Sequence, residues 1–179
     1  MPITIAQAFE QFEELTADLP QDDLIMLSEE WLNYTDGLTK DGELTSLQYQ
    51  YCPAYGDPMP DNDVEYILDA MGVKMSSTSI AKRRDFAADN FSLNASHWQI
   101  HLSRGSVWSF TTNYSMGPAQ GEPELVDVMH SLLIDIQCDE DFDGFCADFG
   151  LDSDSTEAKK MHKSIAKIRT AMAGLFTSA

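Results

Sequence analysis

The sequence predicts an α+β fold, mostly helical, with a small antiparallel sheet that contains a hairpin near residues 97–112. Apolar residues recur every three or four positions over most of the 179-residue chain, which indicates helices with one buried face. Apolar and polar residues alternate most clearly from residue 97 to residue 102, which indicates a strand. At 43% hydrophobic, the chain can build a core. We expect an acidic helical segment over 1–60 and an α+β core over 61–179, or one compact domain over 1–179.

Two helices are predicted at the start of the chain. Thr4 is a candidate cap for the first helix, and proline at position 20 disfavours helix in the residue before it. The predicted apolar stripe of the first helix comprises Ile5, Ala8, Phe9, Phe12 and Leu15, which keep helical spacing. The second helix begins near Asp22 and is expected to turn inward Leu24, Leu27, Trp31 and Leu32. Residues 35–42 predict a turn.

The middle of the chain is predicted to mix strands with loops. Alternation at Leu47, Tyr49 and Tyr51 indicates a half-buried strand, and a proline-rich loop follows. A short helix is then expected, capped by Asp61 or Asp63 and ending at Gly72. Residues 73–80 predict a strand, and 81–96 a polar mobile loop.

Two registers are open for the hairpin. A two-residue turn pairs Leu102 with Val107, whereas a three-residue loop over 104–106 pairs Leu102 with Trp108 and Ile100 with Phe110. A shift of one residue moves every side chain to the other face of the sheet. We favour the three-residue loop, because it keeps Trp108 on the face of Ile100 and Leu102.

Three helices are predicted after Pro123. The first carries an apolar stripe of Leu125, Val128, Met129, Leu132, Leu133 and Ile136. The second is acidic but turns Phe142, Phe145, Cys146 and Phe149 inward. Asp154 with Glu157 forms a candidate capping box for the last helix. Core packing is the favoured role of that last helix, and a homodimer through it is the alternative.

Charge is the most informative property of the composition. The formal net charge is −19, and residues 1–70 hold sixteen acidic residues against one basic residue, Lys40. Residues 122–157 hold twelve acidic residues and no basic one. Such a field repels nucleic acid and favours basic partners, so direct nucleic-acid binding is not expected. The competing interpretation is a solvated acidic surface, with Lys159, Lys160, Lys163 and Lys167 neutralising the acidic segment before them.

Metal and catalytic signatures are weak. Residues 139–144 match the opening of an EF-hand loop, but its twelfth position is Gly150 where a bidentate glutamate is needed. His97 and His101 would lie roughly 13 Å apart on a strand, too far to share a zinc ion. No nucleotide-binding or nucleophile motif occurs. We therefore expect no cofactor, no metal and no enzymatic activity.

The compartment is expected to be the cytoplasm of a host cell. The first fifteen residues lack the basic start and apolar run of a signal peptide, and no apolar run has the length of a membrane span. The three cysteines, at positions 52, 138 and 146, form no CxxC pair and are expected to be free thiols.

A C-terminal pattern carries a resemblance to a family. From Phe142 to Ala158 the sequence reads F-x-x-F-C-x-x-F-G-x-D-x-D-S-x-x-A, which resembles uncharacterised proteins of phages and mobile elements. Earlier blocks at 69–74, 97–102 and 114–117 look similar to the same family, so the resemblance covers about 64–170. Departures are Gly144 and Leu151, where acidic or aromatic residues are usual, and Thr156, where arginine is common. The resemblance implies a phage or plasmid accessory protein and no particular activity.

Charge and resemblance together predict an anti-defence protein of the anti-CRISPR or antirestriction type. Its carboxylates would imitate DNA phosphates and occupy the basic surface of a host nucleic-acid-binding complex. The candidate partner-binding residues are Glu10, Glu14, Asp18, Glu29, Glu30, Asp139, Glu140, Asp143 and Asp148. The alternative is an accessory protein–protein interaction module whose acidity serves only solubility, and an enzyme ranks third.

Overall fold

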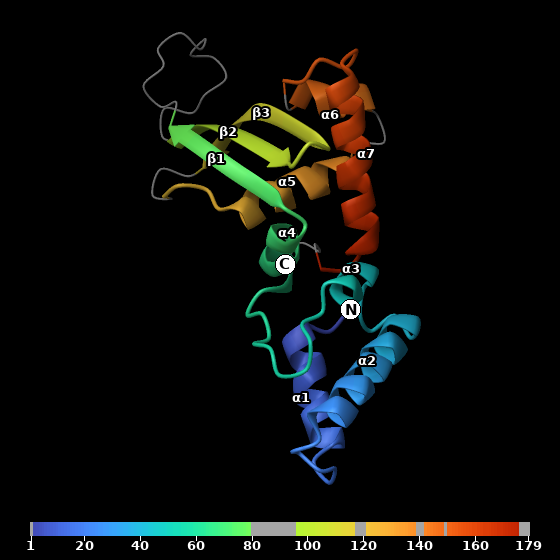
Figure 1. The fold of residues 1–179 in the computed structure, drawn as a ribbon. Helices are drawn as coiled ribbons and strands as arrows, with labels where there is room; N and C mark the ends of the chain where they lie inside the picture. The colour runs from blue at the N-terminus through green and yellow to red at the C-terminus, as the bar shows by residue number, and fades with distance from the viewer. Residues whose placement is uncertain (1, 80–95, 117–120, 139–141, 149, 176–179) are drawn as a thin grey trace. The chain divides into compact units, whose positions relative to one another are not determined.

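The computed structural model describes residues 2–79, 96–116, 121–138, 142–148 and 150–175 (Figure 1). In these ranges the strands of one antiparallel sheet follow four helices in the sequence and precede three more. This content confirms the α+β class. It divides into two compact units, one of Met1–Ala70 with Ile168–Ala179 and the other of Met71–Lys167. The expected segment boundary was near residue 60, whereas this division lies at residue 70. The expected loop at 81–96 lies almost entirely outside the described residues.

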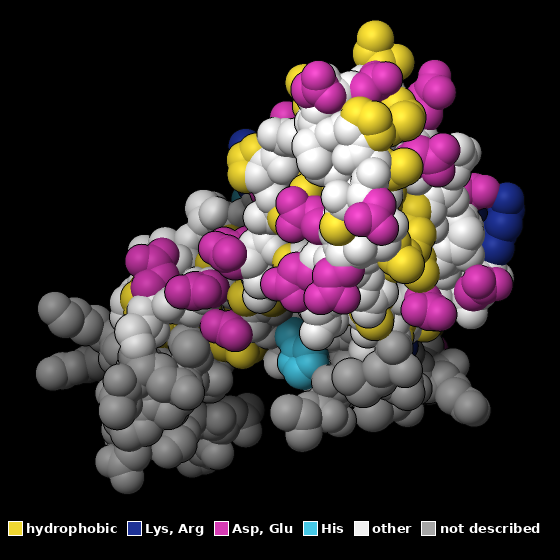
Figure 2. All heavy atoms as spheres, turned by 90° about the horizontal axis from the view of Figure 1, so that it is seen from below, with side chains coloured by type: hydrophobic (Ala, Val, Ile, Leu, Met, Phe, Trp, Pro, Cys, Tyr) yellow, Lys and Arg dark blue, Asp and Glu magenta, His cyan; other side chains and the backbone are white. Residues whose placement is uncertain are grey.

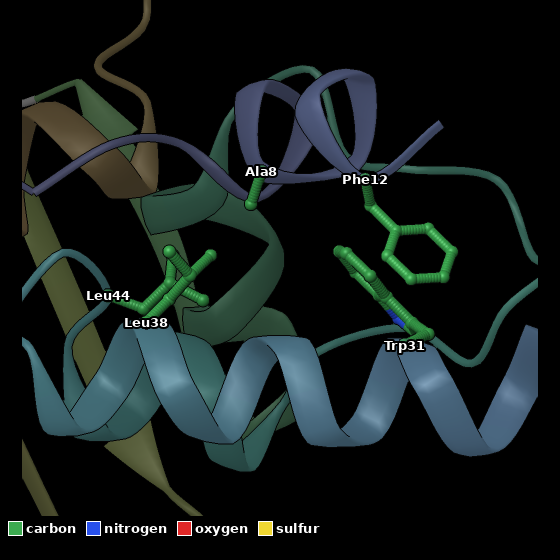
Figure 3. Packing of buried hydrophobic residues seen from close by; sticks show 5 residues of the cluster. All are labelled: Ala8, Phe12, Trp31, Leu38 and Leu44. Atoms are coloured by element: carbon green, nitrogen blue, oxygen red, sulfur yellow. The ribbon is translucent and has the colours of Figure 1, made fainter. Parts of the chain in front are cut away.

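The first unit is built on an antiparallel pair of helices, α1 (Ile5–Leu15) and α2 (Leu24–Lys40). The Thr4 side chain caps α1 in a capping box with Gln7, as its position predicts. Phe12 and Trp31 meet edge to face between the two helices, with ring centroids 5.2 Å apart (Figure 3). The buried cluster comprises Ala8, Phe12, Trp31, Leu38 and Leu44. This aromatic and aliphatic packing fixes the two helices against each other.

The course of α2 differs from the sequence prediction in two ways. Residues 35–40 are helical, so the predicted turn at 35–42 was wrong: the Thr35 hydroxyl donates to the Trp31 carbonyl within the helix, and Gly42, at φ 77°, follows the helix end. Leu24 and Leu32 are 61% and 60% exposed, so their predicted inward position was also wrong. The buried stripe is instead Leu27, Trp31, Thr35 and Leu38.

The predicted strand around Leu47 was wrong as well. Residues Ser46–Gln50 form the short helix α3, because the Thr45 hydroxyl accepts the Gln48 N–H while the Gln48 side chain accepts the Thr45 N–H. Two local hydrogen bonds therefore outweigh the alternating pattern. After α3 the chain runs back to α2, where the Trp31 indole donates to the Pro53 carbonyl at 3.0 Å.

Helix α4 (Asp63–Ala70) is the last helix of the first unit before the chain enters the second unit. Its cap is Asn62, which accepts the Glu65 N–H at 3.0 Å, so neither Asp61 nor Asp63 caps it as predicted. Asp63 is only 4% exposed and accepts two hydrogen bonds from elsewhere in the unit, one from the Ile5 N–H and one from the Gln48 side chain. The Asp63 side chain, predicted to cap its own helix, thus makes long-range hydrogen bonds instead.

The second unit contains the sheet, in the order β1 (Val73–Ser79), β2 (Ser96–Arg104) and β3 (Trp108–Met116), all antiparallel (Figure 1). Leu102 pairs with Phe110 and Arg104 with Trp108, so both predicted registers were wrong and the loop is 105–107. The observed register is shifted by two from the favoured one, which preserves the faces. Trp108 therefore shares the face of Ile100 and Leu102, and all three side chains are buried.

Three helices follow the sheet: α5 (Leu125–Cys138), α6 (Phe142–Asp148) and α7 (Thr156–Ala171). The buried residues of α5 include the predicted Val128, Met129, Leu132 and Leu133. The cap of α7 is Ser155, whose hydroxyl accepts the Ala158 N–H, so the predicted Asp154 cap was wrong. Asp154 instead donates its N–H to the Asp152 carboxylate in a local turn.

Candidate acidic binding surface

The predicted binding residues of α1 face solvent. Glu10 and Glu14 are exposed and lie four residues apart on the face opposite Ile5, Ala8 and Phe12. Asp18 continues the four-residue spacing of Glu10 and Glu14 in the sequence, but α1 ends at Leu15, so Asp18 does not lie on their helical face. The Thr16 hydroxyl donates to the Phe12 carbonyl, and the Gln21 side chain donates to the Thr16 carbonyl. Asp18 is exposed in the turn that these bonds form.

Glu29 and Glu30 are exposed on α2 but point to different flanks. Consecutive residues of a helix are about 100° apart, so the two side chains point in clearly different directions. Glu29 lies one turn from Ile25, whereas Glu30 lies on the opposite side of the buried stripe. The structure therefore spreads the predicted carboxylates of the α1–α2 pair over more than one face.

The acidic character of the first unit is almost unopposed. Of the sixteen acidic residues in 1–70, fourteen are exposed. Lys40 is the one basic residue in that range, and it forms an ion pair with Asp36 one turn away. The hydrogen bond to Asp36 raises the pKa of Lys40 and keeps it charged. Figure 2, which looks from below Figure 1, shows acidic side chains interspersed with hydrophobic ones on the face it presents.

The second predicted cluster is only partly described. Asp143 is exposed on α6, and Asp148 is the last residue of that helix. Asp139 and Glu140 lie outside the described residues. Lys159, Lys160, Lys163 and Lys167 are exposed on α7. Burial raises the pKa of the Cys146 thiol, Asp143 and Asp152 add to this effect, and the charge of Lys159 opposes it.

Helix formation over 142–148 is incompatible with an EF-hand loop there. Phe145 and Cys146 are buried at 0% and 2% exposure, and after the helix the Leu151 N–H donates to the Cys146 carbonyl. Gly150 takes a left-handed φ of 62° at this helix end. The position that lacked a calcium ligand in the sequence is thus a helix terminator. Among the described residues no three potential metal ligands cluster.

Sequence reasoning missed one set of surface residues, the exposed aliphatic side chains of α2. Leu24, Ile25 and Leu32 are 61%, 77% and 60% exposed. A signal existed, because Ile25 and Leu32 are seven residues apart and so share a face, while the face of Leu27 and Trp31 is a different one. Counting Leu24 and Leu32 among the buried residues concealed this second stripe.

The environment of the half-buried Cys52 thiol shifts its pKa clearly. Burial, with a smaller contribution from the charge of Asp63, raises its pKa to about 11. The thiol is therefore protonated at neutral pH and is a poor nucleophile. Burial likewise raises the pKa of Tyr34, with Glu43 adding to the effect.

The chain matches no protein-family model, no curated protein and no solved structure. Within the described part of the chain, no helix combines the length and the apolar composition needed to cross a membrane.

Proposed function

We propose that this protein is a phage or mobile-element anti-defence protein, of the anti-CRISPR or antirestriction type, that inhibits a host nucleic-acid-binding complex through acidic surfaces that imitate DNA. The observation that carries this proposal is the charge of residues 1–70, which hold fourteen exposed acidic side chains and one basic residue, Lys40, already paired with Asp36. A basic nucleic-acid channel is the partner that such a field would attract most strongly.

The density of charge on the α1–α2 pair is about half that of DNA. From Glu10 to Glu30 the sequence holds eight acidic residues and no basic one. Helix α2, with 17 residues, is about 25 Å long, so these eight charges lie at roughly one per 3 Å along the pair. B-DNA carries one per ~1.7 Å of axis. The imitation would therefore be partial, and a good fit to the target would have to supply the remaining affinity.

The resemblance from Phe142 to Ala158 supports a phage or mobile-element origin. Proteins of such elements act inside the host cell, where the defence complexes that bind nucleic acid are found. Host cytoplasm is accordingly the proposed compartment, and a host or defence protein with a basic surface is the proposed partner.

The test is competition for a nucleic-acid site. The protein would be added to a panel of host CRISPR effectors and restriction enzymes, each loaded with a fluorescent DNA duplex, and release of the duplex would be followed by anisotropy. We expect release with at least one member of the panel, weakening steeply between 50 and 300 mM NaCl. No release from any complex that is purified from the native host with this protein would contradict the proposal.

A matched pair of variants separates the proposed surface from total charge. Glu10→Gln/Glu14→Gln/Glu29→Gln/Glu30→Gln removes four exposed charges from α1 and α2. Asp57→Asn/Asp61→Asn/Glu65→Gln/Asp69→Asn removes four exposed charges from the same unit elsewhere. We expect the first variant to inhibit at least tenfold less than the second. Equal inhibition by the two variants would contradict the assignment of the binding surface to α1 and α2.

The second candidate function is an accessory protein–protein interaction module whose acidity serves only solubility. The exposed Leu24, Ile25 and Leu32 favour it, because clustered aliphatic side chains on a charged surface are typical of protein contacts. Under this function, partner binding would depend on these residues and would be insensitive to the four-carboxylate variant.

A further inference from the structure

Helix α2 carries a strip of exposed apolar side chains that do not pack into the core of the first unit. Ile25 and Leu32 are 77% and 60% exposed and lie seven residues apart, so they sit on one side of the helix about 10 Å from each other. Ser28 lies between them and directs its hydroxyl to the Leu24 carbonyl at 2.6 Å. No charged side chain therefore interrupts the strip, and Leu24, 61% exposed, extends it at the helix start.

Acidic side chains border this strip. Glu29 is four residues after Ile25 and three before Leu32, so it stands directly beside both. Asp22 is exposed just before the helix start. Asp36 follows Leu32 by one turn, where Lys40 neutralises it. The border is thus negative at the N-terminal half of the strip and close to neutral at its C-terminal end.

The negative charge of the residues beside the strip favours some binding partners over others. A second copy would bring Glu29 and Asp22 toward their own equivalents, and like charges in an interface are unfavourable. An anionic lipid surface would be repelled in the same way. A helix with aliphatic residues at i, i+3, i+4 and i+7, flanked by lysine or arginine, satisfies both the strip and its border.

We propose that Leu24, Ile25 and Leu32 form a docking strip for a basic amphipathic helix of a partner protein, with Glu29 and Asp22 facing its cations. The proposal rests on the proposed function for the basic character of the partner and adds where that partner is anchored. Aliphatic anchors at the centre of an interface supply affinity, whereas charges at its rim mainly supply association rate and selectivity.

The experiment uses synthetic peptides as probes on the full chain. The first is an 18-residue helix of leucine and lysine with all leucines on one face, the second has the same composition with the leucines scattered, and the third is oligolysine of equal charge. Fluorescence anisotropy at 150 mM NaCl would measure the binding of each to the wild type and to Ile25→Gln/Leu32→Gln. The matched control is Leu15→Gln/Leu19→Gln, which changes two other exposed leucines of the same unit.

We expect the amphipathic peptide to bind the wild type and the control equally, and the strip variant at least tenfold more weakly. Oligolysine should bind all three proteins alike, since their charges are the same. Glutamine keeps the helix propensity of these positions close to that of leucine, and circular dichroism would verify folding. The proposed docking strip would be contradicted if the amphipathic peptide bound the two double variants with equal affinity. It would also be contradicted if the scattered peptide bound the wild type as tightly as the amphipathic peptide does.

Two further measurements test the other occupants. If the wild type sediments as a dimer that Ile25→Gln/Leu32→Gln converts to a monomer, the strip belongs to a second copy and the proposal fails. If the wild type binds phosphatidylglycerol vesicles and the strip variant does not, a lipid surface is the occupant and the proposal fails. Release of duplex DNA from a defence complex involves none of the peptides, so the docking strip and the proposed function can fail separately.

Discussion

The Asp63 carboxylate accepts the backbone N–H of Ile5, 58 residues earlier in the chain, at 2.9 Å. The same oxygen, Oδ2, accepts the Gln48 side chain at 2.7 Å, and Gln48 in turn donates to the Ile3 carbonyl at 2.8 Å. The start of α1, the short helix α3 and the start of α4 are therefore joined through one buried carboxylate. Its other oxygen, Oδ1, has no hydrogen-bond partner among the described residues.

Replacing Asp63 by alanine should destabilise the first unit strongly. Two hydrogen bonds to a charged acceptor are lost, and the Ile5 N–H and the Gln48 amide are left in a site closed to water. We expect a loss of about 2–3 kcal/mol in the free energy of unfolding, measured by urea denaturation. Asp63→Asn should lose less, because its amide oxygen still accepts. Asp61→Ala, at an exposed neighbour, is the control and should stay within about 0.5 kcal/mol of the wild type.

Ser164→Ala should weaken the packing of α7 on the sheet. The Ser164 hydroxyl accepts the Trp108 indole N–H at 3.0 Å and an Arg104 guanidinium N–H at 3.2 Å. Without it the buried Trp108 indole and the half-buried Arg104 guanidinium each lose an acceptor, and we expect a loss of about 1–2 kcal/mol in the unfolding free energy. The exposed Lys163→Ala is the control. If both variants unfold at the same urea concentration, these bonds contribute nothing to stability.

Helical periodicity predicted the helices well, because it records burial directly. In the predicted stripe of α1, Ile5, Ala8 and Phe12 are buried, but Leu15 is 70% exposed, so its place in that stripe was wrong. The predicted stripe of α5 is buried at Val128, Met129, Leu132 and Leu133. Periodicity failed at 46–50, where Thr45 and Gln48 form a capping box that the alternating Leu47 and Tyr49 concealed. That error was avoidable, because the box is itself a local sequence signal.

The role of Asp63 could not be predicted, because its partners are far away in the chain. An aspartate beside a helix start has a local explanation as a cap, and sequence offers no means of preferring Ile5 over Glu65 as the donor. The hairpin register failed for a related reason. The apolar pattern determines which residues share a face, but the loop conformation at Gly105 decides the pairing, and a shift by two residues leaves the pattern unchanged.

The sequence predicted the exposed carboxylates of the candidate site correctly but did not predict its exposed apolar side chains. Glu10, Glu14, Glu29 and Glu30 are exposed as expected, since charged side chains on amphipathic helices seldom face a core. Leu24 and Leu32 were expected inside because they are apolar. Burial of apolar residues is a tendency with many exceptions, and α2 has more such residues than one buried stripe can hold.

The Cys52 thiol should react slowly in the folded protein. Burial raises its pKa to about 11 from an ordinary 9.0, which lowers the thiolate fraction near pH 8 about 100-fold. Alkylation by iodoacetamide at pH 8, with each cysteine followed by peptide mass spectrometry, should therefore be at least that much slower at Cys52 in buffer than in 8 M urea. Equal rates in the two solvents would show that the site opens freely.

His162 should make the stability of the second unit fall as the solution becomes acidic. Its ring lies edge to face with those of Phe142 and Phe145, at centroid distances of 5.2 and 5.0 Å. Burial lowers its pKa below the ordinary value. As the pH falls below about 6.5, the unfolded chain takes up a proton that the folded chain still refuses, so the unfolded state gains stability.

The comparison that isolates this effect is His162→Phe, which keeps an aromatic ring between Phe142 and Phe145 and cannot titrate. Urea denaturation at pH values from 8 to 5 would give the difference in unfolding free energy between wild type and variant. We expect that difference to be constant above pH 7 and to shift steadily in favour of the variant below pH 6.5. Because every carboxylate is common to both proteins, their titration cancels in the difference, and a difference that is flat down to pH 5 would mean that His162 is protonated as easily in the folded protein as in the unfolded one.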